Sequence, residues 1–180
     1  MKSNIALIGF MGAGKSAVGR VLAAAAGMDF IDLDAVIEEK AGRSISEIFA
    51  CEGEPVFRRI EAAITADAAG SENAVIACGG GVVLDQANIE ALRRNAVIIY
   101  LSADPSIMLR RVLNSSEKRP LLQMIDPAAA MDGLLKHRKP LYEAAADLTV
   151  NTSDLDIDSV VQNILAEMRK DESFNFPEQD

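Results

Sequence analysis

The sequence predicts an α/β fold in which a parallel β-sheet carries helices on its faces. Short apolar runs alternate along the whole chain with longer segments of helical periodicity, which is the order expected of β–α units. The runs are continuously apolar, and this is typical of strands that are buried on both faces. No repeat or low-complexity linker divides the 180 residues, so we expect a single domain over residues 1–170.

Each expected strand and helix has a local signal. Strands are predicted where apolar residues are contiguous, at residues 5–8, 30–34, 74–77, 97–101 and 148–150. Helices are predicted from apolar periodicity and start signals, at residues 15–26, 44–49, 55–68, from 105, from 127, and 156–168. Ser44 and Glu47 form a capping-box pattern, while Asp104-Pro105 and Asp126-Pro127 each pair an N-cap residue with proline at the first helical position.

Two segments stand apart from this alternation. Residues 114–120 are polar and charged and lie between the two helices that start with Asp-Pro, so we expect a mobile lid over about residues 112–124. Residues 171–180 carry four acidic residues and no basic one, and we expect this acidic tail to be disordered. Because ligands of parallel sheets bind beyond the carboxyl ends of the strands, the functional residues are expected at that edge.

Composition and charge exclude several classes of protein. The chain has 18 Lys and Arg against 27 Asp and Glu, and a net charge of −9 argues against nucleic-acid or acidic-membrane partners. Its apolar runs are too short to span a bilayer, and its two cysteines form no CxxC pattern, so we expect a cytoplasmic protein with reduced thiols. The single histidine, His137, excludes His-based triads and histidine-rich metal sites. No long apolar surface stripe is apparent, which favours a monomer.

The most specific motif is Gly9–Ser16, which satisfies the phosphate-loop pattern GxxxxGK followed by Ser or Thr. It lies directly after an apolar strand and directly before a helix, as that pattern requires. Gly12 and Gly14 allow backbone N–H groups to approach phosphate oxygens, and the helix N-terminus adds positive dipole charge. Lys15 is expected to reach the β- and γ-phosphates, and the Ser16 hydroxyl to bind Mg²⁺. We interpret this segment as a nucleoside triphosphate site.

Three further groups of residues lie at predicted strand ends or in loops. Asp32 and Asp34 end the second strand, where alternating side chains let one acid face magnesium and the other an acceptor hydroxyl; a solvated strand end is the alternative. Gly79–Gly81 follows the third strand and lets a ligand or another backbone approach closely, unless it is only a structural turn. Arg119 lies in the polar loop, where closure would bring it onto the phosphates.

Taken in order, these motifs resemble those of shikimate kinase. The matching segments are Gly9–Ser16, Asp32-x-Asp34, Phe57-Arg58, Gly79–Gly81, Arg119-Pro120-Leu121-Leu122 and Arg138-Lys139-Pro140-Leu141-Tyr142. The resemblance runs from about residue 5 to residue 168. It implies a three-layer P-loop kinase fold, similar to that of nucleoside monophosphate kinases, with a five-stranded parallel sheet of order 2-3-1-4-5. It also implies transfer of the γ-phosphoryl group of ATP to the 3-hydroxyl of shikimate, in aromatic amino-acid biosynthesis.

The resemblance also implies roles for individual residues. Nucleotide binding would involve the phosphate loop and the arginines near the lid, namely Gly12, Ala13, Gly14, Lys15, Ser16, Ala17, Arg111 and Arg119, with Ser16 and Asp32 serving Mg²⁺. Shikimate binding would involve Asp34 on the hydroxyls and a set that holds the carboxylate, namely Arg58, Arg138 and the loop Gly79, Gly80 and Gly81. Asp34, Lys15 and Arg119 are the expected catalytic residues. The chemistry of the residues agrees, because two arginines can bind a carboxylate bidentately.

Some features depart from the family pattern, and other functions stay open. Ala17 stands where the family often has a second hydroxyl, and residues 151–153 lack an obvious cation for the adenine pocket. Another small-metabolite kinase, such as a gluconate kinase, would share the phosphate loop without requiring the acceptor-side residues. A GTP-dependent switch would need an NKxD motif, and no Asn in this chain is followed by Lys.

Overall fold

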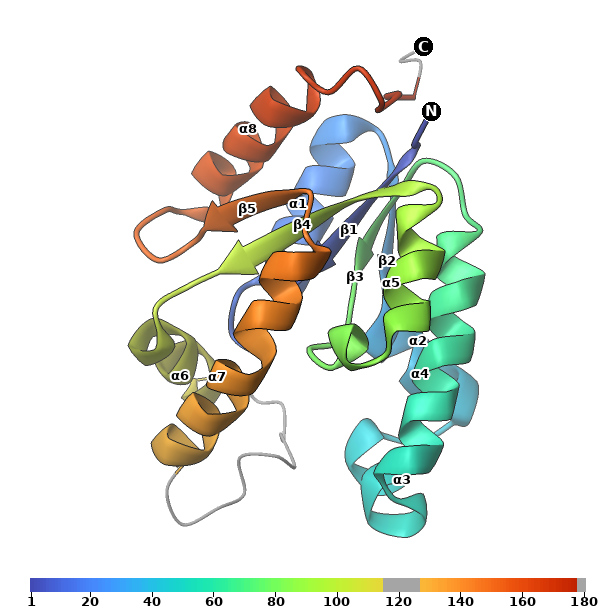
Figure 1. The fold of residues 1–180 in the computed structure, drawn as a ribbon, viewed down its shortest axis with the longest axis vertical. Helices are drawn as coiled ribbons and strands as arrows, with labels where there is room; N and C mark the ends of the chain where they lie inside the picture. Colours follow the sequence, from blue (N-terminus) through green and yellow to red (C-terminus); the bar gives the residue numbers. More distant parts are fainter. Residues whose placement is uncertain (115–126, 178–180) are drawn as a thin grey trace.

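The computed structural model describes residues 1–114 and 127–177, and these residues form a parallel sheet between two layers of helices (Figure 1). The sheet has five parallel strands in the order β2-β3-β1-β4-β5, which confirms the predicted order. The strands are β1 Asn4–Ile8, β2 Asp29–Asp32, β3 Ala74–Ala77, β4 Ala96–Ser102 and β5 Leu148–Asn151.

The helices divide between the two faces of the sheet. Helices α1 and α8 pack against each other on one face, and α4, α5 and α7 cover the other (Figure 1). The helices are α1 Lys15–Ala26, α2 Leu33–Ala41, α3 Ile45–Glu52, α4 Glu54–Ala69, α5 Gln86–Arg93, α6 Pro105–Leu113, α7 Pro127–Ala145 and α8 Ile157–Met168, with the 3₁₀ turn η1 at Val82–Leu84. In the described part of the chain, no helix is long and apolar enough to cross a membrane.

The central strands are the most deeply buried part of the sheet. Every residue of β1 and β3 is buried, and β4 is buried except at its last residue. The edge strands β2 and β5 are only partly buried because each has a single neighbour. Continuous apolar runs therefore identified the central strands correctly, and the carboxyl ends of all five strands lie at one edge of the sheet.

Two helices were not predicted from the sequence, and one of them changes the setting of Asp34. Strand β2 ends at Asp32, whose side chain caps helix α2 by accepting hydrogen bonds from the backbone N–H groups of Asp34 (3.2 Å) and Ala35 (3.5 Å). Asp34 therefore lies in the first turn of a helix and not at a strand end as predicted. The interruption of apolar residues at Asp32 is an N-cap signal. Helix α5 has only eight residues, and half of them are polar, so its apolar periodicity is weak in the sequence.

The structure places residues 171–177 of the acidic tail against the N-terminus, in contrast to the expectation of a disordered tail. The backbone of Lys2 donates to Ser173 O (2.8 Å) and accepts from Asn175 N (2.9 Å). Phe174 is buried and makes an edge-to-face contact with Phe176, their ring centroids 5.0 Å apart. Apolar burial and backbone pairing with the N-terminus outweigh the acidic composition that suggested fraying. Residues 178–180 lie outside the described residues.

Candidate active site

The phosphate loop connects β1 to α1 at the centre of the sheet's carboxyl edge. Gly14 caps α1, and Lys15 is the first residue of that helix. Gly12 has a φ of 78°, and a Cβ there would lie 2.5 Å from the carbonyl oxygen of Met108 on α6. Only glycine fits this position, because both the backbone conformation and the contact with α6 exclude a side chain. The loop therefore wraps the N-terminus of α1 as a cradle for an anion.

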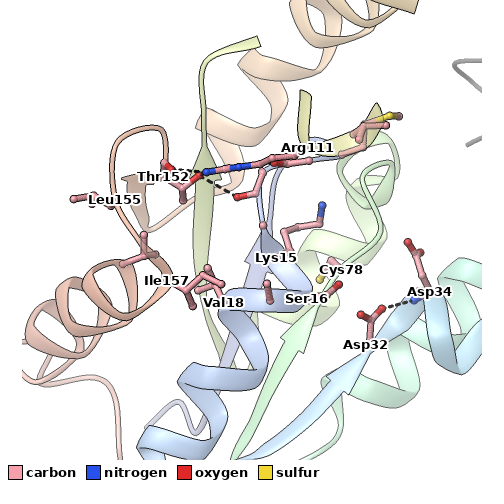
Figure 2. A pocket seen from close by; sticks show the side chains of 17 residues that line it. Lys15, Ser16, Val18, Asp32, Asp34, Cys78, Arg111, Thr152, Leu155 and Ile157 are labelled. Atoms are coloured by element: carbon pink, nitrogen blue, oxygen red, sulfur yellow. Dashed lines mark hydrogen bonds between the residues drawn. The ribbon is translucent and has the colours of Figure 1, made fainter. Parts of the chain in front are cut away.

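A pocket of about 380 Å³ opens directly above this cradle (Figure 2). It brings together predicted residues from three separate segments of the chain. Its lining includes the predicted residues Gly12, Ala13, Gly14, Lys15, Ser16, Ala17, Asp32, Asp34 and Arg111. Arg119 belongs to the predicted nucleotide site as well, but it lies outside the described residues, as does most of the predicted lid.

Lys15 points from the start of α1 into this pocket (Figure 2). Its ammonium group donates to the carbonyl oxygens of Gly9 (3.0 Å) and Phe10 (3.1 Å), so it lies across the loop that carries it. A flexible four-carbon side chain can rotate from these carbonyls to phosphate oxygens without movement of the backbone.

The oxygen donors at the base of the pocket suit a hard divalent cation. Ser16 on α1 and Asp32 at the end of β2 both line the pocket. Among the described residues, there is no group of three or more His, Cys, Asp or Glu side chains that could hold a metal ion. A hydroxyl and a carboxylate fit Mg²⁺, which keeps several waters and takes its remaining ligands from substrate phosphates.

Arg111 on α6 is anchored at the opposite side of the pocket from Asp32 (Figure 2). Its guanidinium donates to Gly12 O (3.2 Å), Thr152 Oγ1 (3.1 Å) and Thr152 O (2.8 Å). Thr152 is only 3% exposed, and its hydroxyl also lies 3.1 Å from Ala13 O. The segment 151–153 therefore has a cation beside it after all, supplied by α6, and sequence reasoning missed Thr152 because its partners are far away in the chain. Leu155 and Ile157 add apolar lining.

On the acceptor side, two carboxylates converge on Gly79. A Cβ at Gly79 would lie 2.9 Å from Oδ1 of Asp34 and 2.8 Å from Oε1 of Glu61, so the two oxygens are within about 6 Å of each other. Glu61, on α4, is 1% exposed, and its Oε1 has no hydrogen-bond partner in the described part of the chain. Burial raises the pKa of Glu61, and Arg58 opposes this shift. Sequence reasoning missed Glu61, although its spacing of three residues from Arg58 on a helix was visible.

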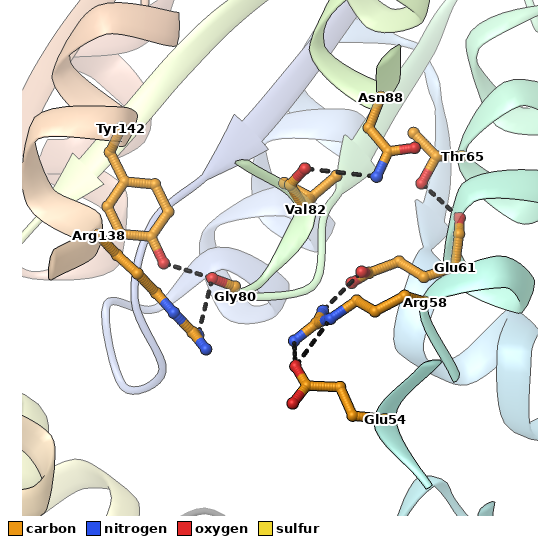
Figure 3. A network of polar contacts seen from close by, with 9 residues as sticks. All are labelled: Glu54, Arg58, Glu61, Thr65, Gly80, Val82, Asn88, Arg138 and Tyr142. Carbon is orange, nitrogen blue, oxygen red and sulfur yellow. Dashed lines mark hydrogen bonds and ion pairs between the residues drawn. The ribbon is translucent and has the colours of Figure 1, made fainter. Parts of the chain in front are cut away.

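Arg58 is held in place by carboxylates on its own helix. Its Nη1 pairs with Glu61 Oε2 at 2.6 Å, and its Nε and Nη2 donate to Glu54 Oε1 at 3.1 and 2.9 Å (Figure 3). Burial lowers the pKa of Arg58, but the two carboxylates outweigh that effect and raise it, so the guanidinium stays charged. Its nitrogens contact the position that a Cβ of Gly81 would occupy. The guanidinium of Arg58 therefore lies directly against the triglycine loop, Gly79–Gly81.

Arg138 reaches the same loop from the other side, on helix α7 (Figure 3). Its Nη1 donates to Gly80 O at 3.2 Å, and the Tyr142 hydroxyl donates to the same oxygen at 2.5 Å. Arg138 is 5% exposed, and its Nε has no partner in the described residues. The guanidinium also lies 5.9 Å from the ring centroid of Phe10. The structure thus brings both predicted arginines to Gly79–Gly81, one on each side.

The cysteines and the histidine are not part of this chemistry. Cys78 lines the pocket but is 2% exposed, and burial raises the pKa of its thiol so far that no nucleophilic thiolate forms. Cys51 is exposed and does not line the pocket. His137 is exposed on α7.

Comparison with known sequences identifies the family. The family model described as shikimate kinase matches residues 11–169 of the chain. A shikimate kinase of Symbiobacterium thermophilum is 43% identical over 93% of this chain and 97% of its own length. A shikimate kinase of Pelotomaculum thermopropionicum is 45% identical over 90% of this chain and 93% of its own length.

Comparison with solved structures agrees. A shikimate kinase from Acinetobacter baumannii in complex with shikimate has a TM-score of 0.91 and 36% identity, covering 96% of both chains. A gluconokinase from Sinorhizobium meliloti covers 93% of this chain and 92% of its own with a TM-score of 0.58, but at 18% identity this likeness shows the fold alone. The chain therefore belongs to the shikimate kinase family, and it is an ATP-dependent kinase that phosphorylates a hydroxyl group of shikimate.

Proposed function

We propose that the chain transfers the γ-phosphoryl group of ATP to the 3-hydroxyl of shikimate, with the acceptor bound between Asp34, Gly79–Gly81 and two arginines. The observation that carries this proposal is the arrangement of Arg58 and Arg138 on opposite sides of one side-chain-free loop. Two guanidinium groups at such a loop can hold a carboxylate in one orientation. The adjacent Asp34 then faces the hydroxyls on the far side of a small ring.

Asp34 is the residue that we assign to the acceptor hydroxyl. Its carboxylate lies beside Gly79, and it also lines the pocket above the phosphate loop, so it borders both the acceptor side and the nucleotide side. From this position it can orient the hydroxyl or accept its proton as the phosphoryl group transfers. Positioning of the two reactants supplies most of the catalysis in phosphoryl transfer.

The nucleotide site completes the proposed mechanism. Gly12–Ala17 would hold the phosphates through backbone N–H groups, and Lys15 would pair with the β- and γ-phosphates. Ser16 and Asp32 would hold Mg²⁺, which neutralises phosphate charge when it is bound. Arg111 would hold the nucleotide side of the pocket from its anchor on Thr152. Arg119 keeps its predicted role as a lid arginine on the phosphates, on the strength of the sequence motif alone.

The substitution Asp34→Asn tests the assignment. We expect kcat with shikimate to fall roughly 10²–10⁴-fold, because the charge that orients or accepts the proton is lost while the shape is kept. Binding of ATP, measured by calorimetry, should be nearly unchanged, whereas Lys15→Ala should weaken it. A near-normal kcat, or a loss of ATP binding as severe as in Lys15→Ala, would show that Asp34 does not act on the acceptor.

A paired substitution and a choice of acceptors test the other end of the substrate. Arg138→Ala should mainly raise KM for shikimate, with a smaller effect on kcat, because it removes contacts to the carboxylate. A coupled assay of ADP release should show much faster turnover with shikimate than with gluconate or AMP. Equal rates with gluconate would favour the gluconate kinase alternative.

We also propose that the enzyme acts as a cytoplasmic monomer that needs no nucleic acid or membrane partner. The large apolar side chains that are exposed in the described residues are few, namely Met1, Leu84, Leu113, Leu155 and Ile157. Two of these, Leu155 and Ile157, line the pocket. Sedimentation equilibrium should give a mass near 19.2 kDa. A mass near twice that value would overturn the monomer.

A further inference from the structure

The carbonyl oxygen of Gly80 accepts two hydrogen bonds from helix α7. The Tyr142 hydroxyl donates at 2.5 Å and the Nη1 of Arg138 at 3.2 Å (Figure 3). Both donors are buried, with Tyr142 0% and Arg138 5% exposed. Burial raises the pKa of Tyr142, and Arg138 only partly opposes this shift, so the phenol keeps the proton that it donates.

The triglycine loop needs an external anchor of this kind. Three successive residues without side chains have the largest backbone freedom to lose when a loop is ordered. The peptide bonds of the described residues are all trans, so the carbonyl of Gly80 and the N–H of Gly81 point in opposite directions. Holding the Gly80 carbonyl toward α7 therefore turns the Gly81 N–H away from α7. One hydrogen bond at Gly80 sets the orientation of a whole peptide group in the proposed carboxylate site.

The Tyr142 hydroxyl also affects what Arg138 can do. The carbonyl of Gly80 accepts from this hydroxyl as well as from Nη1 of Arg138, so it does not depend on Arg138 alone. Without the hydroxyl, this partly buried carbonyl would rely on the guanidinium of Arg138 and compete with a substrate carboxylate for it. Tyr142 thus leaves the charge of Arg138 available to an anionic ligand.

We propose that Tyr142 is a positioning residue for shikimate, whose hydroxyl holds Gly80 so that the triglycine loop and Arg138 are oriented to receive the substrate carboxylate. This inference rests on the proposed function for the place where that carboxylate binds. Tyr142 acts through Gly80 and Arg138, so its removal should weaken substrate binding more than it slows phosphoryl transfer.

The experiment compares two substitutions that each remove one phenolic hydroxyl from the same aromatic pair. Tyr142 stacks on Tyr100, with ring centroids 5.1 Å apart, and Tyr100 is also buried. Tyr142→Phe keeps the ring and its stacking, and we expect KM for shikimate to rise about three- to tenfold, the loss expected for one intramolecular hydrogen bond. KM for ATP should not change, and kcat should change less than KM for shikimate. Tyr100→Phe should leave all three constants at their wild-type values.

Three results would overturn the inference. These are an unchanged KM for shikimate in Tyr142→Phe, a parallel rise of both KM values that indicates general loosening, and an equal effect of Tyr100→Phe. Arg138→Ala separates this inference from the proposed function. If KM for shikimate rises in Arg138→Ala but not in Tyr142→Phe, only the role of Tyr142 is wrong. If neither variant affects that KM, the proposed carboxylate site is itself wrong.

A second measurement does not require Tyr142→Phe to fold. The chain has only 2 tyrosines, so wild-type protein labelled with 3-fluorotyrosine should give two ¹⁹F resonances, assigned with Tyr100→Phe. Titration with shikimate should shift the Tyr142 resonance and leave that of Tyr100 nearly in place. If the chemical shift of the Tyr142 resonance does not change at saturating shikimate, the proposed link between Tyr142 and the shikimate site is contradicted.

Discussion

Thr152 joins three parts of the nucleotide side, and Thr152→Val removes that junction without changing the shape of the side chain. The hydroxyl accepts a hydrogen bond from Arg111 Nη1 at 3.1 Å and lies 3.1 Å from Ala13 O and 3.2 Å from Ser102 O. A hydroxyl has one hydrogen, so it donates to one of these carbonyls at a time. Ser102 O already accepts from the backbone N–H of Thr152 at 2.8 Å. Ala13 O and Arg111 are therefore the groups that lose a partner.

The size of the effect follows from these contacts. Leaving one buried polar group unsatisfied costs about 1–3 kcal/mol. In a protein of this length, each kcal/mol lowers Tm by roughly 2–4 °C, so Thr152→Val should melt several degrees below the wild type. Arg111 keeps its bonds to Gly12 O and Thr152 O, so its position should loosen without being lost. We expect KM for ATP to rise about three- to tenfold and KM for shikimate to stay constant.

The assay is steady-state kinetics with each substrate varied, together with calorimetric melting. Thr152→Ser is the matched control because it keeps the hydroxyl and removes only the methyl group, and its KM for ATP should return close to the wild-type value. If Thr152→Val has a wild-type KM for ATP, or if serine behaves like valine, then the hydroxyl does not position Arg111.

Two further predictions concern stability. Burying a phenylalanine contributes about 1.5–3 kcal/mol to the free energy of unfolding, and Phe174 is 8% exposed. Phe174→Ala should therefore lower Tm by several degrees with kcat unchanged. An unchanged Tm would mean that the tail does not pack on the rest of the domain. The half-buried Phe176 is the control, and Phe176→Ala should cost less. The capping box lowers the pKa of Glu47 through its bonds to Ser44, so the stability it provides is present above the ordinary Glu pKa and is lost as the pH falls through the lowered value. Glu47→Gln should thus melt lower than the wild type at neutral pH, and the difference should vanish once Glu47 is protonated; a difference that persists in acid would refute this account.

Contiguous signals explain what could be predicted from the sequence. The predicted helix 15–26 and strand 74–77 coincide with α1 and β3, and the predicted capping box at Ser44 is present. The phosphate loop was identifiable because its residues are adjacent in the chain and perform their task as one turn. The setting of Asp34 was predicted wrongly. Side chains were expected to alternate along a strand through Asp34, but Asp32 in fact caps helix α2 and ends the strand.

Two residues that were not predicted, Thr152 and Tyr142, share a different property. Thr152 contacts Ala13 across 139 positions, and Tyr142 contacts Gly80 across 62 positions. Each bonds to a backbone carbonyl, which every residue type has, so no pairing of residue types marks the contact. Only the fold brings such partners together, and the sequence could at most indicate that a buried Thr or Tyr needs a hydrogen-bond partner.

The cations of the site show how an acidic chain can bind anionic substrates. The net charge of −9 repels anions at long range, so the attraction must be local. Arg58 is partly neutralised by Glu54 and Glu61. Arg111 and Arg138, by contrast, donate to uncharged oxygens among the described residues. Such oxygens hold a guanidinium in place without cancelling its charge, so these two arginines remain able to attract the anionic groups that we propose for each side of the site. The backbone of Gly12, Gly80 and Thr152 thus supports the electrostatics of the site as well as its shape.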